Sequence, residues 1–210
     1  IISKVKAAAS VKVVRSLRGS EPNTRSTNEI LTPAVQTSEA TFHRNKELKE
    51  VPFRRKPNYS SSVSKPPAIV VLGASTGGPV AIRTLLEHLP HDFDATIVIV
   101  QHIPAAFSNV LAAQLHGQLP LRASVACAGE VIESRRIYVA PGDQHLLLNS
   151  QLEWEFKNGP PISGHCPSID VTMKSIGQVF SGPVFGVLLT GMGVDGASGL
   201  QFLRSRGNTT

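Results

Sequence analysis

The chain has 210 residues, and its content of 41% hydrophobic and 17% charged residues excludes both a coiled coil and a wholly disordered protein. Its two cysteines, Cys127 and Cys166, form neither a disulfide framework nor a paired zinc motif, so we expect a reducing, cytoplasmic compartment. The net charge of +6 arises in residues 1–67, which hold 13 Lys or Arg against 5 Asp or Glu. The rest of the chain therefore lacks the basic surface that is typical of a nucleic-acid-binding domain.

The N-terminal third of the chain is predicted to contain a short helix followed by a flexible linker. Residues 2–16 can form a short helix, and lysines at positions 4, 6 and 12 interrupt the apolar core that a signal peptide needs. Residues 17–67 are rich in Pro, Ser, Thr, Lys and Arg and contain no long periodic apolar segment. Such a segment cannot bury enough surface to offset its ordering entropy, so we expect a flexible linker over 17–67.

From residue 68 onward, apolar strands alternate with amphipathic helices. A strand that is covered on both faces is apolar throughout, and such runs occupy residues 68–72, 96–100, 137–140 and 184–189. Helical periodicity and start signals predict helices over residues 79–89, 107–115, 168–180 and 197–206. Strands and helices that alternate at such short intervals predict a doubly wound, mostly parallel α/β sheet with helices on both faces.

The uncharged stretch from residue 175 to residue 194 is long enough to suggest a membrane span. It contains Gln178, Ser181, Gly182 and Pro183, which do not suit the interior of a transmembrane helix. We interpret it as a helix end, a turn and a buried strand, and we predict no membrane insertion.

Three polar residues follow the carboxyl ends of three predicted strands. Ser75 follows the first strand, His102 the second and Asp195 the last. Ligands of open α/β sheets bind at this edge, where neighbouring strand ends lie roughly 5 Å apart. The three side chains can therefore converge as a nucleophile, its general base and a carboxylate that orients the base.

The turn around Ser75 matches the G-x-S-x-G pattern of a nucleophile elbow. It reads GASTG and lies between a buried strand and a predicted helix, whose N-terminus offers N–H donors to a developing oxyanion. The order Ser, His, Asp differs from the Ser, Asp, His order of the α/β-hydrolases, which argues against membership of that superfamily.

Each of these residues also has a structural interpretation. Ser75 and Asp195 can cap helices, His102 can be a packed histidine, and His145 likewise follows a predicted strand. The turn GASTGG can instead bind an anion in a non-catalytic α/β module, although it lacks the lysine of a P-loop. Only the joint placement of the three polar residues favours catalysis.

Five segments together resemble, in order and spacing, the CheB family of bacterial chemotaxis. They are GASTGGPVAIRTLLEHLP, VIVQHIPAAFSNVLAAQL, IYVAPGDQHLLL, GHCPSIDVTMKSI and GVLLTGMGVDGASGLQFLR. The resemblance as a whole covers about residues 68–207. Family members are protein-glutamate methylesterases and protein-glutamine glutaminases. The resemblance implies a CheB methylesterase-like fold and a serine hydrolase that demethylates glutamate esters and deamidates glutamines on chemotaxis receptors. We expect no metal and no cofactor.

The resemblance also implies roles for individual residues. By motif, Ser75 is similar to the family's nucleophile, His102 to its general base and Asp195 to the third member of its triad. Thr76 and the backbone N–H of Met192, which resembles an oxyanion donor, enter the site on the resemblance alone. The family commonly has an arginine where this chain has Cys166, so a cation that could attract an acidic receptor helix is missing.

The resemblance further implies partners. Family members usually carry an N-terminal receiver domain, controlled by a histidine kinase, in front of the linker. Residues 1–16 resemble the end of the last receiver helix, with the receiver itself absent, and residues 68–210 resemble a catalytic domain that is truncated at its C-terminus. We therefore expect the chemotaxis receptors as substrates, the receiver and its kinase as further partners, and no nucleic acid.

Overall fold

The computed structural model describes residues 65–90, 92–116, 119 and 121–210. The helix expected over residues 2–16 and the linker up to residue 64 lie outside the described residues, so the predictions about them stay predictions.

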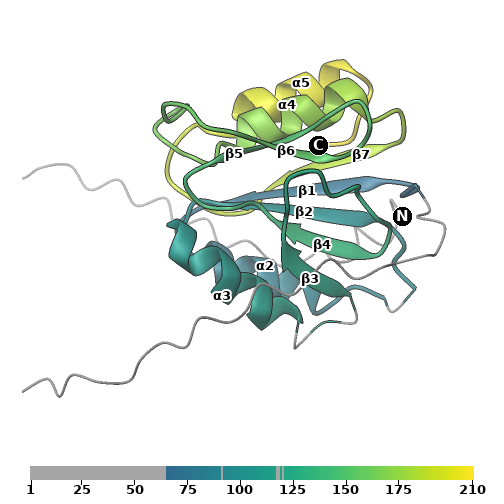
Figure 1. Cartoon of the computed structure of the whole chain (residues 1–210), viewed down its shortest axis with the longest axis horizontal. Coiled ribbons are helices and arrows are strands. Elements are labelled where there is room, and N and C mark those ends of the chain that lie inside the picture. Colours follow the sequence, from purple (N-terminus) through teal and green to yellow (C-terminus); the bar gives the residue numbers. More distant parts are fainter. Residues whose placement is uncertain (1–64, 91, 117–118, 120) are drawn as a thin grey trace, which may run out of the picture. The chain divides into compact units, whose positions relative to one another are not determined.

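Five parallel strands form the central sheet in the order β3-β4-β2-β1-β7 (Figure 1). Their bounds are β1 (Ile69–Ala74), β2 (Thr96–Gln101), β3 (Arg122–Val125), β4 (Arg136–Val139) and β7 (Val184–Leu188). Every residue of β1 and β2 is buried, as a continuous apolar run predicts. The edge strand β3 was not predicted, because it is short and partly exposed and therefore lacks that apolar signature.

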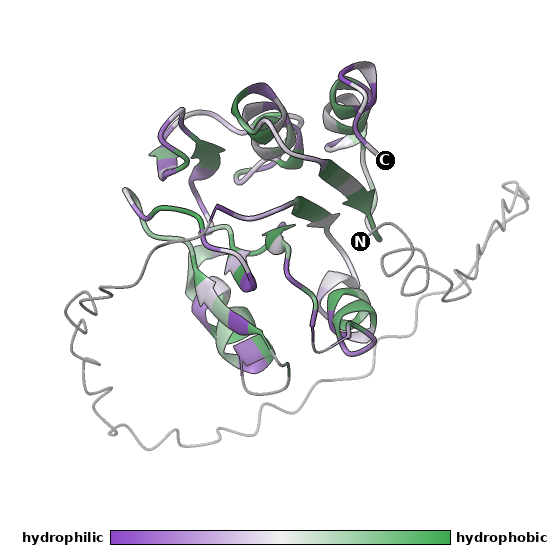
Figure 2. Cartoon of the chain, turned by 90° about the vertical axis from the view of Figure 1, so that its right-hand side faces the viewer, coloured by the Kyte–Doolittle hydropathy of each residue, from purple (hydrophilic) through white to green (hydrophobic). Residues whose placement is uncertain are grey.

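Helices cover both faces of this sheet, which confirms the predicted doubly wound α/β class. In Figure 1, α2 (Gly78–Leu86) and α3 (Ala105–His116) lie below the sheet, and α4 (Ile169–Val179) and α5 (Ala197–Ser205) lie above it. Alternate strand residues belong to two separate cores: Val70 and Ile97 pack with α2 and α3, whereas Val71 and Val98 pack with α4 and α5. Figure 2 shows these apolar strands between helices that carry both apolar and polar residues.

A two-stranded antiparallel hairpin also covers the sheet face occupied by α4. It consists of β5 (His145–Leu148) and β6 (Trp154–Lys157). Leu146, Leu148 and Trp154 share a core with residues of α4. The sequence analysis did not predict this hairpin, because its two strands have only four residues each and lie between two stronger apolar signals.

Within the described part of the chain, no helix is both long enough and apolar enough to span a membrane. Residues 175–194 contain the end of α4, a turn and β7, so the interpretation of this stretch as helix end, turn and buried strand is confirmed.

Candidate active site

The carboxyl ends of β1, β2 and β7 meet at one edge of the sheet. Ser75 follows β1 directly and His102 follows β2 directly, and the last residues of these strands are register partners. The backbone N–H of His102 donates to the Ala74 carbonyl at 3.0 Å, and that of Ser75 donates to the Thr190 carbonyl at 2.7 Å. The ladder thus continues past both strand ends and holds Ser75 between its two neighbours.

The backbone around Ser75 is fixed from two sides. Gly77 caps α2 with a φ of 75°, a left-handed conformation that glycine adopts without strain. The buried side chain of Gln101 donates to the Ser75 carbonyl at 2.8 Å from the neighbouring strand. Ser75 itself is half-buried, so its hydroxyl group lies within reach of a substrate at the surface.

Gly191 approaches Ser75 so closely that a larger residue would displace the serine. A Cβ atom added to Gly191 would lie 2.7 Å from the Cβ of Ser75. We expect Gly191→Ala to shift the hydroxyl and lower the rate at which a serine-directed phosphonate labels Ser75 by about 100-fold. Gly159→Ala is the matched control, because nothing lies within 4 Å of an added Cβ there. Equal rates for the two variants would contradict the close contact between Gly191 and Ser75.

His102 and Asp195 form the central hydrogen bond of the site. His102 Nε2 lies 2.8 Å from Asp195 Oδ2, and the two side chains are only 10% and 1% exposed. Because the carboxylate can only accept, Nε2 carries the proton and Nδ1 carries the lone pair. Nδ1 is buried and has no hydrogen-bond partner among the described residues, so the Ser75 hydroxyl is not bonded to it here. Catalytic hydrogen bonds often shorten only when substrate binds.

Asp195 is bound to the N-terminus of α4. Its Oδ2 accepts the His102 ring and the backbone N–H of Ile169, at 2.8 Å each. Its Oδ1 accepts the Ser168 hydroxyl at 2.8 Å and the backbone N–H of Asp170 at 3.1 Å. Burial works to raise the pKa of Asp195, but these hydrogen bonds together outweigh it and hold the pKa below its ordinary value of 3.8. The carboxylate is therefore charged at neutral pH.

A second aspartate, at the start of α4, accepts hydrogen bonds from the N-terminus of α5. Asp170, in the first turn of α4, accepts the backbone N–H groups of Gly196 at 3.0 Å and Gly199 at 2.6 Å, at the start of α5. Asp195 precedes α5 and accepts N–H groups at the start of α4. Asp170 lies in the first turn of α4 and accepts N–H groups at the start of α5. This exchange fixes the position of Asp195 relative to both helices.

Asp170→Ala should destabilise the fold and disturb the triad, because it leaves two buried backbone N–H groups without an acceptor. We expect the free energy of unfolding to fall by about 2–3 kcal/mol, as measured by urea denaturation. Asp170→Asn keeps a side-chain oxygen and should lose less. Asp94→Ala, at an exposed aspartate, is the control. An Asp170→Ala protein as stable as this control would contradict the capping role.

The site also contains three potential metal ligands. Nitrogen or oxygen atoms of His102, His165 and Asp195 all lie within 4.8 Å of one another. However, the two imidazole rings are stacked with centroids 3.7 Å apart and planes 11° apart, so their lone pairs lie in two nearly parallel planes and do not both point at one ion. Both oxygens of Asp195 already accept two hydrogen bonds each. This arrangement suits a hydrogen-bonded triad and does not fit an ion.

The other sequence-predicted residues lie around this centre. Thr76 is exposed, and its carbonyl accepts the Thr190 hydroxyl at 3.1 Å. Met192 lies in the loop between β7 and α5 with its side chain 83% exposed. Burial and the nearby Asp143 raise the pKa of the Cys166 thiol, so it stays neutral and supplies no cation. The parts that Thr76 and the Met192 N–H play in the reaction stay predictions.

Sequence reasoning did not assign His165, Ser168, Asp170 or Gln101 to the site. Ser168, the first residue of the helix predicted over residues 168–180, caps α4 and accepts the backbone N–H of Val171. Both Ser168 and Asp170 lie in the segment GHCPSID. Several polar residues close to the start of a predicted helix were the signal that could have indicated a role in the site.

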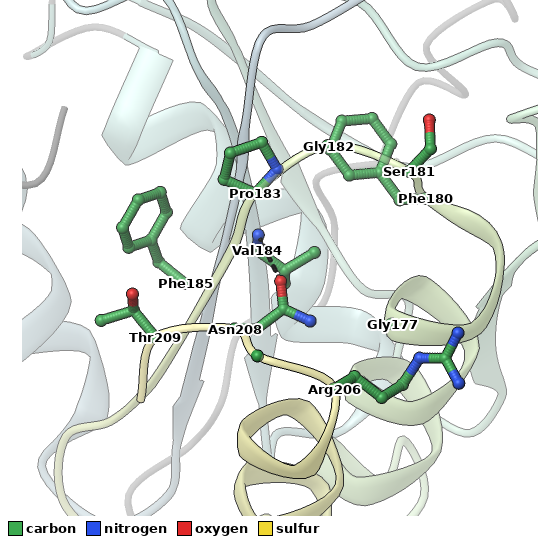
Figure 3. A pocket seen from close by; sticks show the side chains of 11 residues that line it. Gly177, Phe180, Ser181, Gly182, Pro183, Val184, Phe185, Arg206, Asn208 and Thr209 are labelled. Carbon is green, nitrogen blue, oxygen red and sulfur yellow. Dashed lines mark hydrogen bonds between the residues drawn. The ribbon is translucent and has the colours of Figure 1, made fainter.

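A pocket of about 520 Å³ lies at the opposite edge of the sheet (Figure 3). It is lined by the segment before β7, the end of α4 and the residues that follow α5, and Asn208 Oδ1 accepts the Val184 backbone N–H there at 2.9 Å. Because Val184 begins β7, this pocket lies at the amino edge and is separate from Ser75, His102 and Asp195.

Comparisons with known proteins identify related sequences. Residues 70–210 match the family model described as CheB methylesterase. A protein-glutamate methylesterase/protein-glutamine glutaminase of Geobacillus kaustophilus is 38% identical over 157 residues, covering 73% of this chain and 45% of the relative. One of Symbiobacterium thermophilum is 33% identical over 210 residues, covering 100% of this chain and 53% of the relative. The chain thus spans about half the length of these relatives.

A solved structure is similar as well. The crystal structure of the Thermotoga maritima CheB methylesterase catalytic domain matches with a TM-score of 0.64 and 35% sequence identity. The match covers 67% of this chain and 76% of that chain.

Proposed function

Because this chain belongs to the CheB methylesterase family, we propose that it is a serine hydrolase that demethylates glutamate methyl esters on chemotaxis receptors. The observation that carries the proposal is the bond from His102 Nε2 to the buried Asp195, which leaves the lone pair of Nδ1 for a proton. Ser75, at the neighbouring strand end, supplies that proton.

In the acylation step, the Ser75 hydroxyl attacks the ester carbonyl and gives its proton to His102 Nδ1. Asp195 stabilises the imidazolium that forms. The oxyanion accepts hydrogen bonds from the Met192 backbone N–H and from the N-terminus of α2, which follows the serine. Methanol leaves with the proton from His102, and the acyl group stays on Ser75.

In the deacylation step, water gives a proton to His102 Nδ1 and attacks the acyl-enzyme. The proton returns to Ser75 as the free glutamate leaves. The same acyl-enzyme forms from a glutamine side chain, in which case His102 protonates the amide nitrogen, which leaves as ammonia. We therefore include glutamine deamidation in the proposed activity, with the amide as the poorer substrate.

The proposed partners are the methylated receptor helices as substrates, together with a receiver domain and its histidine kinase, in the cytoplasm. A basic, proline-rich tether over residues 17–67 suits a regulatory domain that must move while it stays at high effective concentration. The receiver, in this proposal, covers the site until it is phosphorylated.

Methanol release from receptor membranes methylated with a radiolabelled methyl group tests the proposed function. We expect release by the 210-residue chain and single labelling of Ser75 by a serine-directed phosphonate. A receptor peptide with glutamine at the methylation position should gain about one dalton in mass, since deamidation replaces NH₂ with OH. A folded chain that releases no methanol and takes up no phosphonate would overturn the esterase proposal and favour an anion-binding module at the GASTGG turn.

A further inference from the structure

The ring of His165 covers one face of His102. The centroids of the two imidazoles are 3.7 Å apart and their planes differ by 11°, so the rings are stacked face to face. His165 is half-buried, whereas the side chain of His102 is 10% exposed. The triad chemistry by itself does not require this contact.

The chain holds His165 firmly in this place. Ile162 and His165 exchange both backbone hydrogen bonds, at 3.0 and 3.1 Å, across a tight turn formed by Ser163 and Gly164. Both turn residues have positive φ, 53° and 80°, the conformation of a two-residue hairpin turn. His165 Nδ1 lies 2.9 Å from the Ser163 carbonyl, which can only accept, so Nδ1 carries the proton.

The hydrogen bonds of the His102 side chain do not by themselves fix the orientation of its ring plane. A single hydrogen bond from Nε2 to Asp195 allows the ring to rotate about that bond, which would move Nδ1 away from the reacting serine. Nδ1 has no hydrogen-bond partner among the described residues that could prevent this rotation. A parallel ring at van der Waals distance fixes the plane and excludes water from that face.

We propose that His165 is a positioning residue, whose ring stacks on His102 and holds the base in the plane in which Nδ1 can take the proton of Ser75. This role rests on the proposed esterase function. It makes the flat face of His165 the essential feature, with its hydrogen bond to Ser163 serving only to orient the ring.

Three substitutions separate stacking from hydrogen bonding. His165→Ala removes both, His165→Gln keeps a side-chain amide that can bond the Ser163 carbonyl, and His165→Phe keeps a flat ring without a nitrogen. We expect Ala and Gln to lower kcat by about tenfold with KM changed less than about twofold, and Phe to stay within about threefold of wild type. His88→Ala is the matched control, because its Nδ1 also contacts only a nearby carbonyl, that of Thr84 at 2.7 Å.

Wild-type kcat in the Ala or Gln variant, or a Phe variant as slow as Ala, would overturn the proposal. Imidazole NMR of the same proteins gives a readout that does not depend on activity. The ring protons of His102 should shift in His165→Ala and return toward wild-type positions in His165→Phe. If the wild-type chain hydrolyses no ester, the esterase proposal fails, and unshifted His102 resonances in His165→Ala would separately refute the stacking role.

Discussion

Ser75→Ala and His102→Ala are each expected to lower ester hydrolysis by on the order of 10⁴- to 10⁶-fold, measured as methanol release. Ser75→Ala removes the oxygen that forms the acyl bond in the proposed mechanism, and His102→Ala removes the lone pair on Nδ1. Because the two residues act as a unit, the double variant should be little slower than either single one.

The controls are Ser150→Ala and His88→Ala, at an exposed serine and an exposed histidine. Both should keep wild-type rates, and urea denaturation should show that all variants are folded in the absence of denaturant. Losses that add up in the double variant, or near-normal turnover by Ser75→Ala, would show that Ser75 and His102 do not form one catalytic unit.

Asp195→Asn is expected to inactivate the site and weaken the fold at the same time. The carboxylate accepts two hydrogen bonds on each oxygen, so an amide NH₂ faces N–H donors in either orientation. Toward His102 it would reverse the tautomer and place the proton on Nδ1, where the base is needed. We expect kcat to fall by about 10⁴-fold and the free energy of unfolding by about 1–3 kcal/mol.

The pH dependence of stability distinguishes the charge of Asp195 from the shape of its side chain. The pKa of Asp195 in the folded chain lies below its ordinary value of 3.8, so its charge stabilises the fold fully above that value. As pH falls through the folded pKa, this contribution is lost. The stability difference between wild type and Asp195→Asn should therefore stay constant from about pH 7 to about pH 5 and shrink below about pH 4.

Asp143→Asn is the control for this series, since Asp143 is exposed and its φ of 63° is a conformation that asparagine tolerates. A difference between wild type and Asp195→Asn that changes between about pH 7 and about pH 5 would mean that another group titrates with the triad.

The positions of Ser75 and His102 could be predicted from the sequence for a local reason. Both follow strands that are buried on both faces, and such strands are recognised in the sequence as unbroken apolar runs. Parallel strands that are neighbours in the sheet bring their carboxyl ends together, so two strand-end residues approach each other without any further signal. The sheet class, its helices and the last strand follow from the same periodicity.

The weaker elements could not be predicted in this way. The strands β3, β5 and β6 have four residues each: β3 and β6 are partly exposed and mix apolar with polar residues, and the apolar run of β5 is only three residues long. Their place depends on partners that are supplied by the rest of the fold, such as β4 for β3 and α4 for the β5–β6 hairpin.

Only the tertiary structure decided how the third member of the triad is held. From sequence, Asp195 was a residue near the last strand that could equally cap the last helix; in the structure it caps α4, and Asp170 caps α5 instead. Asp195 lies 93 positions from His102, and its bonds to the α4 N-terminus join residues 25 to 27 positions away. Hydrogen bonds between a side chain and a distant backbone N–H, like the stacking of His165 on His102, leave no periodic trace in the sequence, because they form only once packing has brought the two segments together.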